Sequence, residues 1–122
     1  MFSELLLDHF RNPRNVGTLE APAVRVRVEN PACGDILELS ALAVDGHIRE
    51  VRYHVRGCTA SIAAGSATTC LLEGQPIAAL AAIGIAHIEE AVGGLENASK
   101  HAARLCADGV KALLTELRRS IN

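Results

Sequence analysis

Aromatic side chains are nearly absent from this sequence, and the absence restricts its function. Of 122 residues only Phe2, Phe10 and Tyr53 are aromatic, and there is no tryptophan. Surfaces that bind single-stranded nucleic acid stack bases on aromatic platforms. The formal net charge of −2 also provides no basic surface for a phosphate backbone. The composition therefore argues against nucleic-acid binding and predicts a core of aliphatic side chains.

Long hydrophobic runs are also missing. The longest apolar stretch, residues 77–88, is interrupted by Gly84 and His87, and it is too short to span a bilayer as a helix. The chain starts with acidic residues at Glu4 and Asp8, where a signal peptide would have a basic and then an apolar region. We therefore expect a cytoplasmic protein with no membrane partner.

Four cysteines stand out against this background. In a chain without export signals they are expected to be reduced thiols. A chain of 122 residues that is 49% hydrophobic has enough apolar surface for one core without disulfides. The sequence predicts a single domain over residues 1–122.

The first half of the chain has the pattern of an antiparallel sheet. Valines alternate with charged residues over 24–29, the period of a half-buried strand. Further strands are expected over 36–44 and 48–55, and Asp45-Gly46 between them predicts a tight hairpin turn. Three strands with one solvent-exposed face follow from this pattern.

Helical signals dominate elsewhere. Ser3 can cap a short first helix that reaches about Phe10, and Thr59 or Ser61 can cap a helix that runs to about residue 73. Shorter helices are expected over 76–82 and 83–92, before a stop at Gly93-Gly94. Asn97 or Ser99 can cap a long amphipathic helix to about residue 117. The predicted fold class is α+β, a three-stranded antiparallel sheet packed against helices.

Two cysteines lie at joints between predicted elements, where a thiol can bind a metal. Cys33 precedes Gly34 and Asp35 in the turn before the second strand, and Cys58 follows Gly57 between the third strand and a helix. In an antiparallel meander the start of strand two and the end of strand three lie at the same end, so these side chains can converge. A helix N-terminus favours a thiolate, the form that binds metal. The glycines would let the backbone approach whatever the thiolates hold.

A tetrahedral site with two thiolates and one carboxylate lacks one ligand. His101, in the first turn of the last helix, is the best candidate to supply it. Each residue alone has an ordinary explanation: free cysteines are commonly buried and inert, an aspartate in a turn commonly caps it, and His101 could be a surface residue. Cys70, in the middle of a predicted helix, is interpreted as a packing or surface residue.

Three motifs resemble the IscU/NifU family of iron–sulfur cluster scaffolds. They are DHFRNPRNVG at 8–17, PACGD at 31–35 and GCTASIA at 57–63. The resemblance covers nearly the whole chain, in order. It implies the SufE/NifU-like fold and a scaffold that accepts sulfur from a cysteine desulfurase, builds a transient [2Fe–2S] cluster and passes it to recipient iron–sulfur proteins. It also implies that zinc can occupy the site.

The sequence departs from that family in its last helix. The family carries a third cysteine, usually directly after a histidine. Alignment without a gap puts His101 on that histidine and Ala102 where the cysteine belongs, whereas a gapped alignment makes Cys106 the third cysteine. The ungapped alignment is preferred. The family's proline-rich chaperone-recognition segment is also missing, since no proline lies between Gly93 and His101.

Three functions remain open from the sequence. The preferred one is the scaffold, which has no enzymatic turnover, with Cys33, Asp35, Cys58 and His101 as the metal- and cluster-binding residues. The alternative is a zinc-binding sulfur-acceptor protein for a cysteine desulfurase. A Cys–His hydrolase using Cys58 and His101 is a third, but no oxyanion-hole residue can be named for it.

Overall fold

Three antiparallel strands form one sheet, with the helices packed on one of its faces. The computed structural model describes residues 1–120. The strands are β1 (Val24–Glu29), β2 (Ile36–Val44) and β3 (His47–Arg56), in the order β1-β2-β3. Their bounds agree with the strands expected from the sequence to within one residue. The α+β class predicted above is confirmed.

The hairpin between β2 and β3 forms at the dipeptide that predicted it. Asp45 and Gly46 both have positive φ, 53° and 77°, as a two-residue turn that follows the twist of the strands requires. The pairing runs from Val44 opposite His47 to Ile36 opposite Arg56, with a bulge near Leu42. This register brings the start of β2 and the end of β3 to one edge of the molecule.

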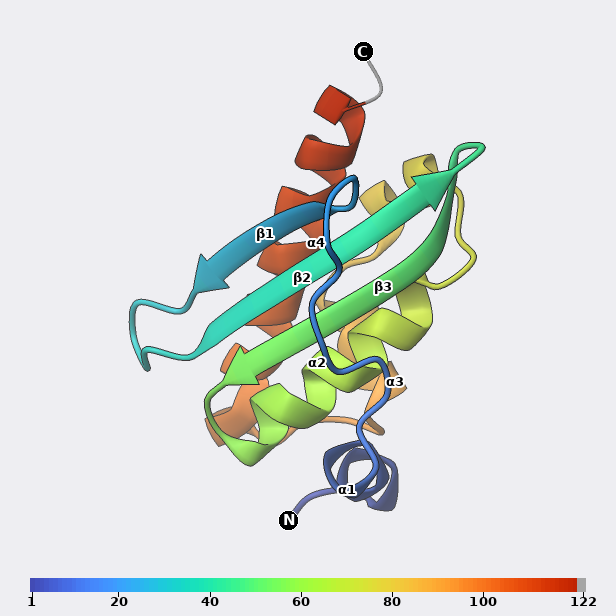
Figure 1. The fold of residues 1–122 in the computed structure, drawn as a ribbon. Helices are drawn as coiled ribbons and strands as arrows, with labels where there is room; N and C mark the ends of the chain where they lie inside the picture. Colours follow the sequence, from blue (N-terminus) through green and yellow to red (C-terminus); the bar gives the residue numbers. More distant parts are fainter. Residues whose placement is uncertain (121–122) are drawn as a thin grey trace.

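The helices follow the predicted order with adjusted ends. They are α1 (Glu4–Arg11), α2 (Thr59–Leu72), the 3₁₀ helix η1 (Ile77–Ala82), α3 (Ile85–Ala91), the short 3₁₀ turn η2 (Asn97–Ser99) and α4 (Lys100–Ser120). Helices α2 and α4 lie side by side behind the sheet, α4 against β1 and β2 and α2 against β3 (Figure 1). Within residues 1–120, no helix combines the length and hydrophobicity that crossing a membrane requires.

The core between sheet and helices is aliphatic, as the composition predicts. Leu37 and Leu39 of β2 are fully buried against α4. At Gly109 of α4 an added methyl carbon would lie 2.6 Å from Leu37, so the glycine lets helix and strand approach closely. The apolar face of α4 is buried in this core, with Leu105, Val110, Leu113, Leu114 and Leu117.

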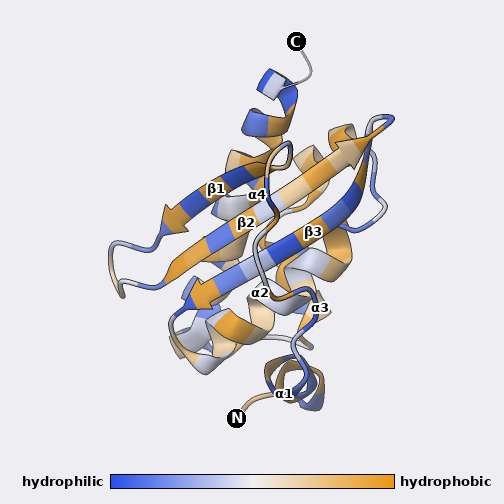
Figure 2. Cartoon of the chain, viewed as in Figure 1, coloured by the Kyte–Doolittle hydropathy of each residue, from blue (hydrophilic) through white to orange (hydrophobic). Residues whose placement is uncertain are grey.

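The opposite face of the sheet is polar and crossed by the segment that follows α1. Figure 1 shows this segment in front of β2 and β3, and Figure 2 shows hydrophilic and hydrophobic residues alternating along the strands. The backbone of Tyr53 accepts a hydrogen bond from Gly17 N–H and donates one to the carbonyl of Asn15. Leu19 N–H donates to Ser40 Oγ at 2.9 Å. The segment is therefore hydrogen-bonded to the face of the sheet that would otherwise be solvent-exposed.

Helix α1 and the turn after it are attached to α2 through His9 and Arg14 of the DHFRNPRNVG motif. The Ser66 hydroxyl lies 2.8 Å from His9 Nδ1, and the same hydroxyl accepts the backbone N–H of Arg14. Arg14 Nη1 lies 3.2 Å from His9 Nδ1. Since a guanidinium only donates, Nδ1 must be an acceptor and the imidazole is neutral. His9 and Arg14 of this motif thus have a structural role, which is to hold α1 against α2.

One helix cap was predicted wrongly. The N-cap of α2 is Cys58, and neither Thr59 nor Ser61 caps the helix with its side chain. Ser3 does cap α1, because its Oγ accepts the N–H of Leu6 at 2.9 Å. Ser61 instead lies at the third helical position with its hydroxyl directed to a neighbouring loop, which matters for the site described below.

The His9 contact predicts a pH-dependent stability. Burial, and then the Arg14 guanidinium, lower the pKa of His9 below its ordinary value of 6.5, against a smaller opposing effect of Asp8. Below about pH 6.5 the unfolded chain therefore binds a proton that the folded chain resists, so stability falls as the pH drops. Urea unfolding between pH 7.5 and 5.5 should show this loss, and His9→Gln should reduce it.

The matched control is His54→Gln, because His54 is exposed on the sheet. It should keep the parent's pH dependence. An equal loss in the parent and in His9→Gln would show that the acid sensitivity comes from other groups.

Candidate metal centre

Four chain segments meet at one edge of the molecule. They are the loop before β2, the end of β3, the start of α2 and the start of α4 (Figure 1). The first two meet because Ile36, directly after the loop, pairs with Arg56. The third follows Arg56 after two residues, and α4 contacts α2 along the back of the sheet. The loop contributes Cys33 and Asp35, the start of α2 contributes Cys58, and the start of α4 contributes His101.

Asp35 lies at the centre of this edge, and its side chain is 11% exposed. Its Oδ2 accepts a hydrogen bond from the Ser61 hydroxyl at 2.7 Å and a long one from the backbone N–H of Cys58 at 3.4 Å. Both donors belong to the first turn of α2, where the helix dipole favours a negative charge. The carboxylate is therefore held at a helix N-terminus.

The charge on Asp35 is stabilised by these donors. Burial by itself raises the pKa of Asp35, but hydrogen bonds from the Ser61 hydroxyl, from the N–H of Cys58 and from the thiols of Cys58 and Cys33 together lower it, so the net pKa lies below the ordinary 3.8. Asp35 is thus an ionised carboxylate at neutral pH. An anion at this depth is a suitable ligand for a cation.

Gly57 makes room for that carboxylate. A methyl carbon at position 57 would lie 2.5 Å from Asp35 Cγ, closer than any real contact. Its role therefore differs from the expected one, because the glycine admits the neighbouring ligand and not a bound group. Gly34 has a φ of +78° and nothing within 4 Å of its added carbon, so it serves the conformation of the loop.

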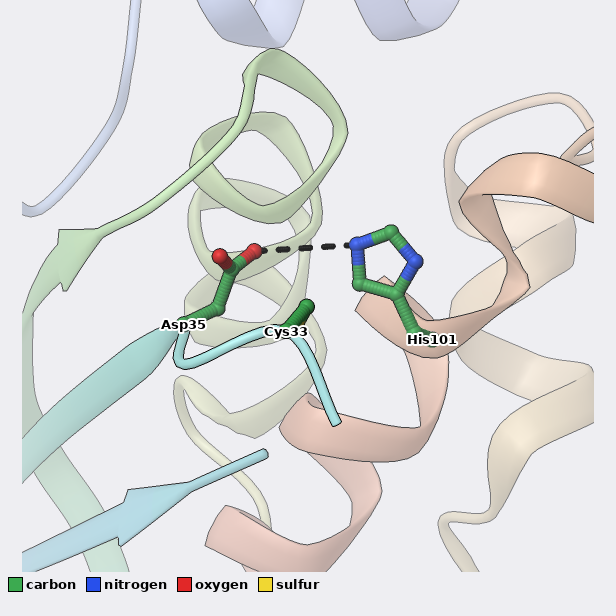
Figure 3. Close-up of side chains that lie close together, drawn as sticks. All are labelled: Cys33, Asp35 and His101. Carbon is green, nitrogen blue, oxygen red and sulfur yellow. Dashed lines mark ion pairs between the residues drawn. The ribbon is translucent and has the colours of Figure 1, made fainter. Parts of the chain in front are cut away.

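Cys33, Asp35 and His101 form a group of possible metal ligands. One ligand atom from each lies within 4.8 Å of the other two. In Figure 3 the Asp35 carboxylate and the His101 ring face each other, with Cys33 beside them on the loop before β2. His101 Nε2 lies 3.6 Å from Asp35 Oδ2.

Cys58 reaches the same place from α2. Its Sγ lies 3.4 Å from His101 Nε2, although it is outside the three-residue group. Metal–nitrogen and metal–oxygen bonds of about 2.0 Å and metal–sulfur bonds of about 2.3 Å put the ligand atoms of a tetrahedral ion roughly 3.3–3.5 Å apart. The distances from His101 Nε2 to Cys58 Sγ and to Asp35 Oδ2 are close to these values.

The other cysteines lie elsewhere. Cys106 is fully buried in the core, and burial raises the pKa of its thiol to about 12 against a hydrogen bond with Thr68, so it stays protonated. It follows His101 by five residues, which turns the two side chains about 140° apart on an ideal helix. Ala102, where the family's third cysteine was expected, is also fully buried. Cys70 is exposed on α2.

The structure brings Cys33, Asp35 and His101 together and places Cys58 Sγ beside His101 Nε2, whereas the sequence did not indicate two supporting residues. Ser61 was considered only as a helix cap, and Gly57 only as a site of close approach. The spacing of Cys58 and Ser61, three positions apart on one helix face, is a signal that could have linked them. Nothing in the sequence indicated that the hydroxyl would reach Asp35.

The fold and the site together define an α+β protein whose thiol, carboxylate and imidazole groups are gathered where they can hold a metal ion. Comparison with known proteins agrees. The family model described as the NifU-like N terminal domain matches residues 1–121. This chain therefore belongs to the IscU/NifU family.

Curated relatives match over most of their length. The iron–sulfur cluster assembly scaffold protein IscU of Haemophilus influenzae is 32% identical, and the match covers 96% of this chain and 95% of that protein. The scaffold protein IscU 1 of Archaeoglobus fulgidus is 34% identical, with 98% of this chain and 78% of that protein covered. Both relatives are named as scaffold proteins.

Solved structures share the fold. The N-terminal NifU-like protein from Brucella abortus superimposes with a TM-score of 0.77 at 17% identity, covering 96% of this chain and 94% of that chain. An iron–sulfur scaffold described for the SUF system of Fervidobacterium islandicum gives 0.72 at 16% identity, with 93% and 96% covered. At these identities the likeness concerns the fold alone.

The contact between Gly57 and Asp35 can be tested with one methyl group. Gly57→Ala should displace the carboxylate and weaken zinc binding by about tenfold or more, since misplaced ligands and their supports typically cost 10- to 100-fold in affinity. Competition titration with a zinc chelator measures this. Gly84→Ala is the control, because position 84 has open space and an ordinary φ of −120°. Unchanged affinity in Gly57→Ala would contradict the contact.

His101 and Cys106 should respond differently to truncation. His101→Ala removes a proposed ligand and should weaken zinc binding clearly near pH 7, where neutral imidazole is available. Cys106→Ala should leave zinc binding unchanged and lower stability through a small cavity. The same titration, combined with urea unfolding, compares the two. Loss of zinc in Cys106→Ala with full binding in His101→Ala would favour the gapped alignment.

Proposed function

We propose that this protein is an iron–sulfur cluster assembly scaffold whose cargo is held by Cys33, Asp35, Cys58 and His101. The observation that carries the proposal is that Cys33, Asp35 and His101 form one group of possible ligands at this edge, with Cys58 Sγ 3.4 Å from His101 Nε2. Family membership supports it, because curated relatives that match most of the chain are named as such scaffolds.

The ligand set suits a transient cargo. Thiolates bind iron–sulfur clusters and soft metals, whereas carboxylate is a harder ligand and imidazole an intermediate one. Cys33 and Cys58 are exposed, so sulfur can be delivered and a finished cluster removed without opening the core. We further propose that the sulfur comes from a cysteine desulfurase, that the cluster is of the [2Fe–2S] type, and that recipient iron–sulfur proteins take it up in the cytoplasm.

A second function follows from the site geometry. The distances of 3.4 Å and 3.6 Å from His101 Nε2 to Cys58 Sγ and Asp35 Oδ2 suit a single tetrahedral ion, which favours zinc. In a zinc-binding sulfur-acceptor protein the metal would position a thiolate that receives sulfur from a desulfurase. The fold shared with the SUF-system scaffold does not discriminate between the two functions.

Anaerobic reconstitution separates the two functions. Protein incubated with ferrous iron and sulfide should develop visible absorbance and contain both elements if it is a scaffold. Cys33→Ser and Cys58→Ser should each lose the cluster, because one thiolate is a poor ligand set for it, whereas Cys70→Ser is the control and should keep it. Zinc that cannot be displaced and no cluster under any condition would favour the sulfur acceptor.

Asp35 should affect how long the cluster persists. A carboxylate oxygen is a weaker ligand for an iron–sulfur cluster than a thiolate, so Asp35 should keep the cargo labile. Asp35→Ala is therefore expected to hold a reconstituted cluster several times longer than the parent. Visible absorbance followed over hours measures the lifetime. Faster loss in the variant would contradict the proposal of a labile scaffold.

A further inference from the structure

Ser61 has no role in the site as expected from the sequence, yet its side chain is fully buried directly beneath it. Its hydroxyl lies 2.7 Å from Asp35 Oδ2. An ionised carboxylate can only accept, so Ser61 must donate, and its single proton is committed to this bond. Its oxygen in turn accepts the thiol of Cys58 at 3.4 Å. Ser61 thus connects two of the proposed ligands.

Besides the weaker contacts with the thiols of Cys33 and Cys58, two longer contacts of Asp35 Oδ2 involve nitrogen. The N–H of Cys58 lies at 3.4 Å and His101 Nε2 at 3.6 Å, beyond the 2.7–3.2 Å of well-formed hydrogen bonds to nitrogen. A short hydrogen bond from a hydroxyl to a charged group is the stronger kind. Ser61 is therefore the main donor that fixes the Asp35 carboxylate, and Gly57 provides the space that the carboxylate occupies.

We propose that Ser61 is a positioning residue for Asp35, which holds the carboxylate toward Cys33 and His101 and thereby sets how firmly the site keeps its metal. This inference rests on the proposed function only for the identity of the bound cargo. The hydrogen bond acts on Asp35 before any metal arrives. Side chains that orient a metal ligand from behind typically change metal affinity by 10- to 100-fold when removed.

Cobalt(II) binding to the metal-free protein tests the proposal, because its visible spectrum reports both affinity and coordination geometry. Ser61→Ala should weaken cobalt binding by about 10- to 100-fold and change the intensity of the visible bands. In an Asp35→Ala background the same substitution should change neither, since Ser61 acts through Asp35. Thr68→Val is the matched control. It also removes a fully buried hydroxyl from α2, but that hydroxyl bonds to the carbonyl of Ala64 and to the Cys106 thiol, neither of which is a proposed ligand.

Two results would overturn the proposal. One is cobalt binding by Ser61→Ala that equals the parent's. The other is an equal loss in the parent and in the Asp35→Ala background, which would mean that Ser61 supports the helix in general. A crystal structure of metal-free Ser61→Ala is an independent check. The Asp35 carboxylate should have left the N-terminus of α2, and an unmoved carboxylate would contradict the inference.

Cluster lifetime separates this inference from the proposed function. If the protein is a scaffold, Ser61→Ala should shift the lifetime of a reconstituted cluster toward that of Asp35→Ala. If the protein forms no cluster but shows the expected cobalt result, the scaffold proposal is contradicted and the role of Ser61 is supported. The opposite result is a cluster that lasts equally long in the parent and in Ser61→Ala but longer in Asp35→Ala. It would contradict the role of Ser61 and support the scaffold proposal.

Discussion

The antiparallel pairing of β2 with β3 is the constraint on which the candidate metal centre depends. It sets Ile36 opposite Arg56, and so places Asp35 beside the Gly57-Cys58 joint at the N-terminus of α2. A slip of one residue would turn every side chain of a strand to the other face. The apolar residues of β2 prevent this, because they are fully buried against α4. The core therefore fixes the position of residues that are themselves at the surface.

Much of this arrangement could be predicted from the sequence. Alternation of valine with charge located β1, and Asp45-Gly46 located the hairpin, because both signals are local and depend on backbone geometry. The convergence of Cys33, Asp35 and Cys58 followed from the topology of a meander. The hydrogen bond of Ser61 could not be predicted, since it joins side chains 26 positions apart whose contact depends on how α2 packs. The local preference of serine suggested that Ser61 caps α2, but in the structure its hydroxyl bonds to Asp35.

The last helix resolves an ambiguity that alignment left open. Cys106 and His101 were both candidates to complete the site, and their distance along the helix allows only one of them to face it. The structure places His101 at the edge and Cys106 in the aliphatic core. With alanine at position 102 and Cys106 in the core, the exposed thiols at this edge are those of Cys33 and Cys58.

We propose that one metal ion can be bound by two sulfurs, one carboxylate oxygen and one imidazole nitrogen. X-ray absorption at the zinc edge of the zinc-loaded protein measures this ligand set directly. We expect two sulfur neighbours at about 2.3 Å and two nitrogen or oxygen neighbours at about 2.0 Å, with one sulfur lost in Cys58→Ser. Three sulfur neighbours, or a spectrum unchanged in Cys58→Ser, would contradict it.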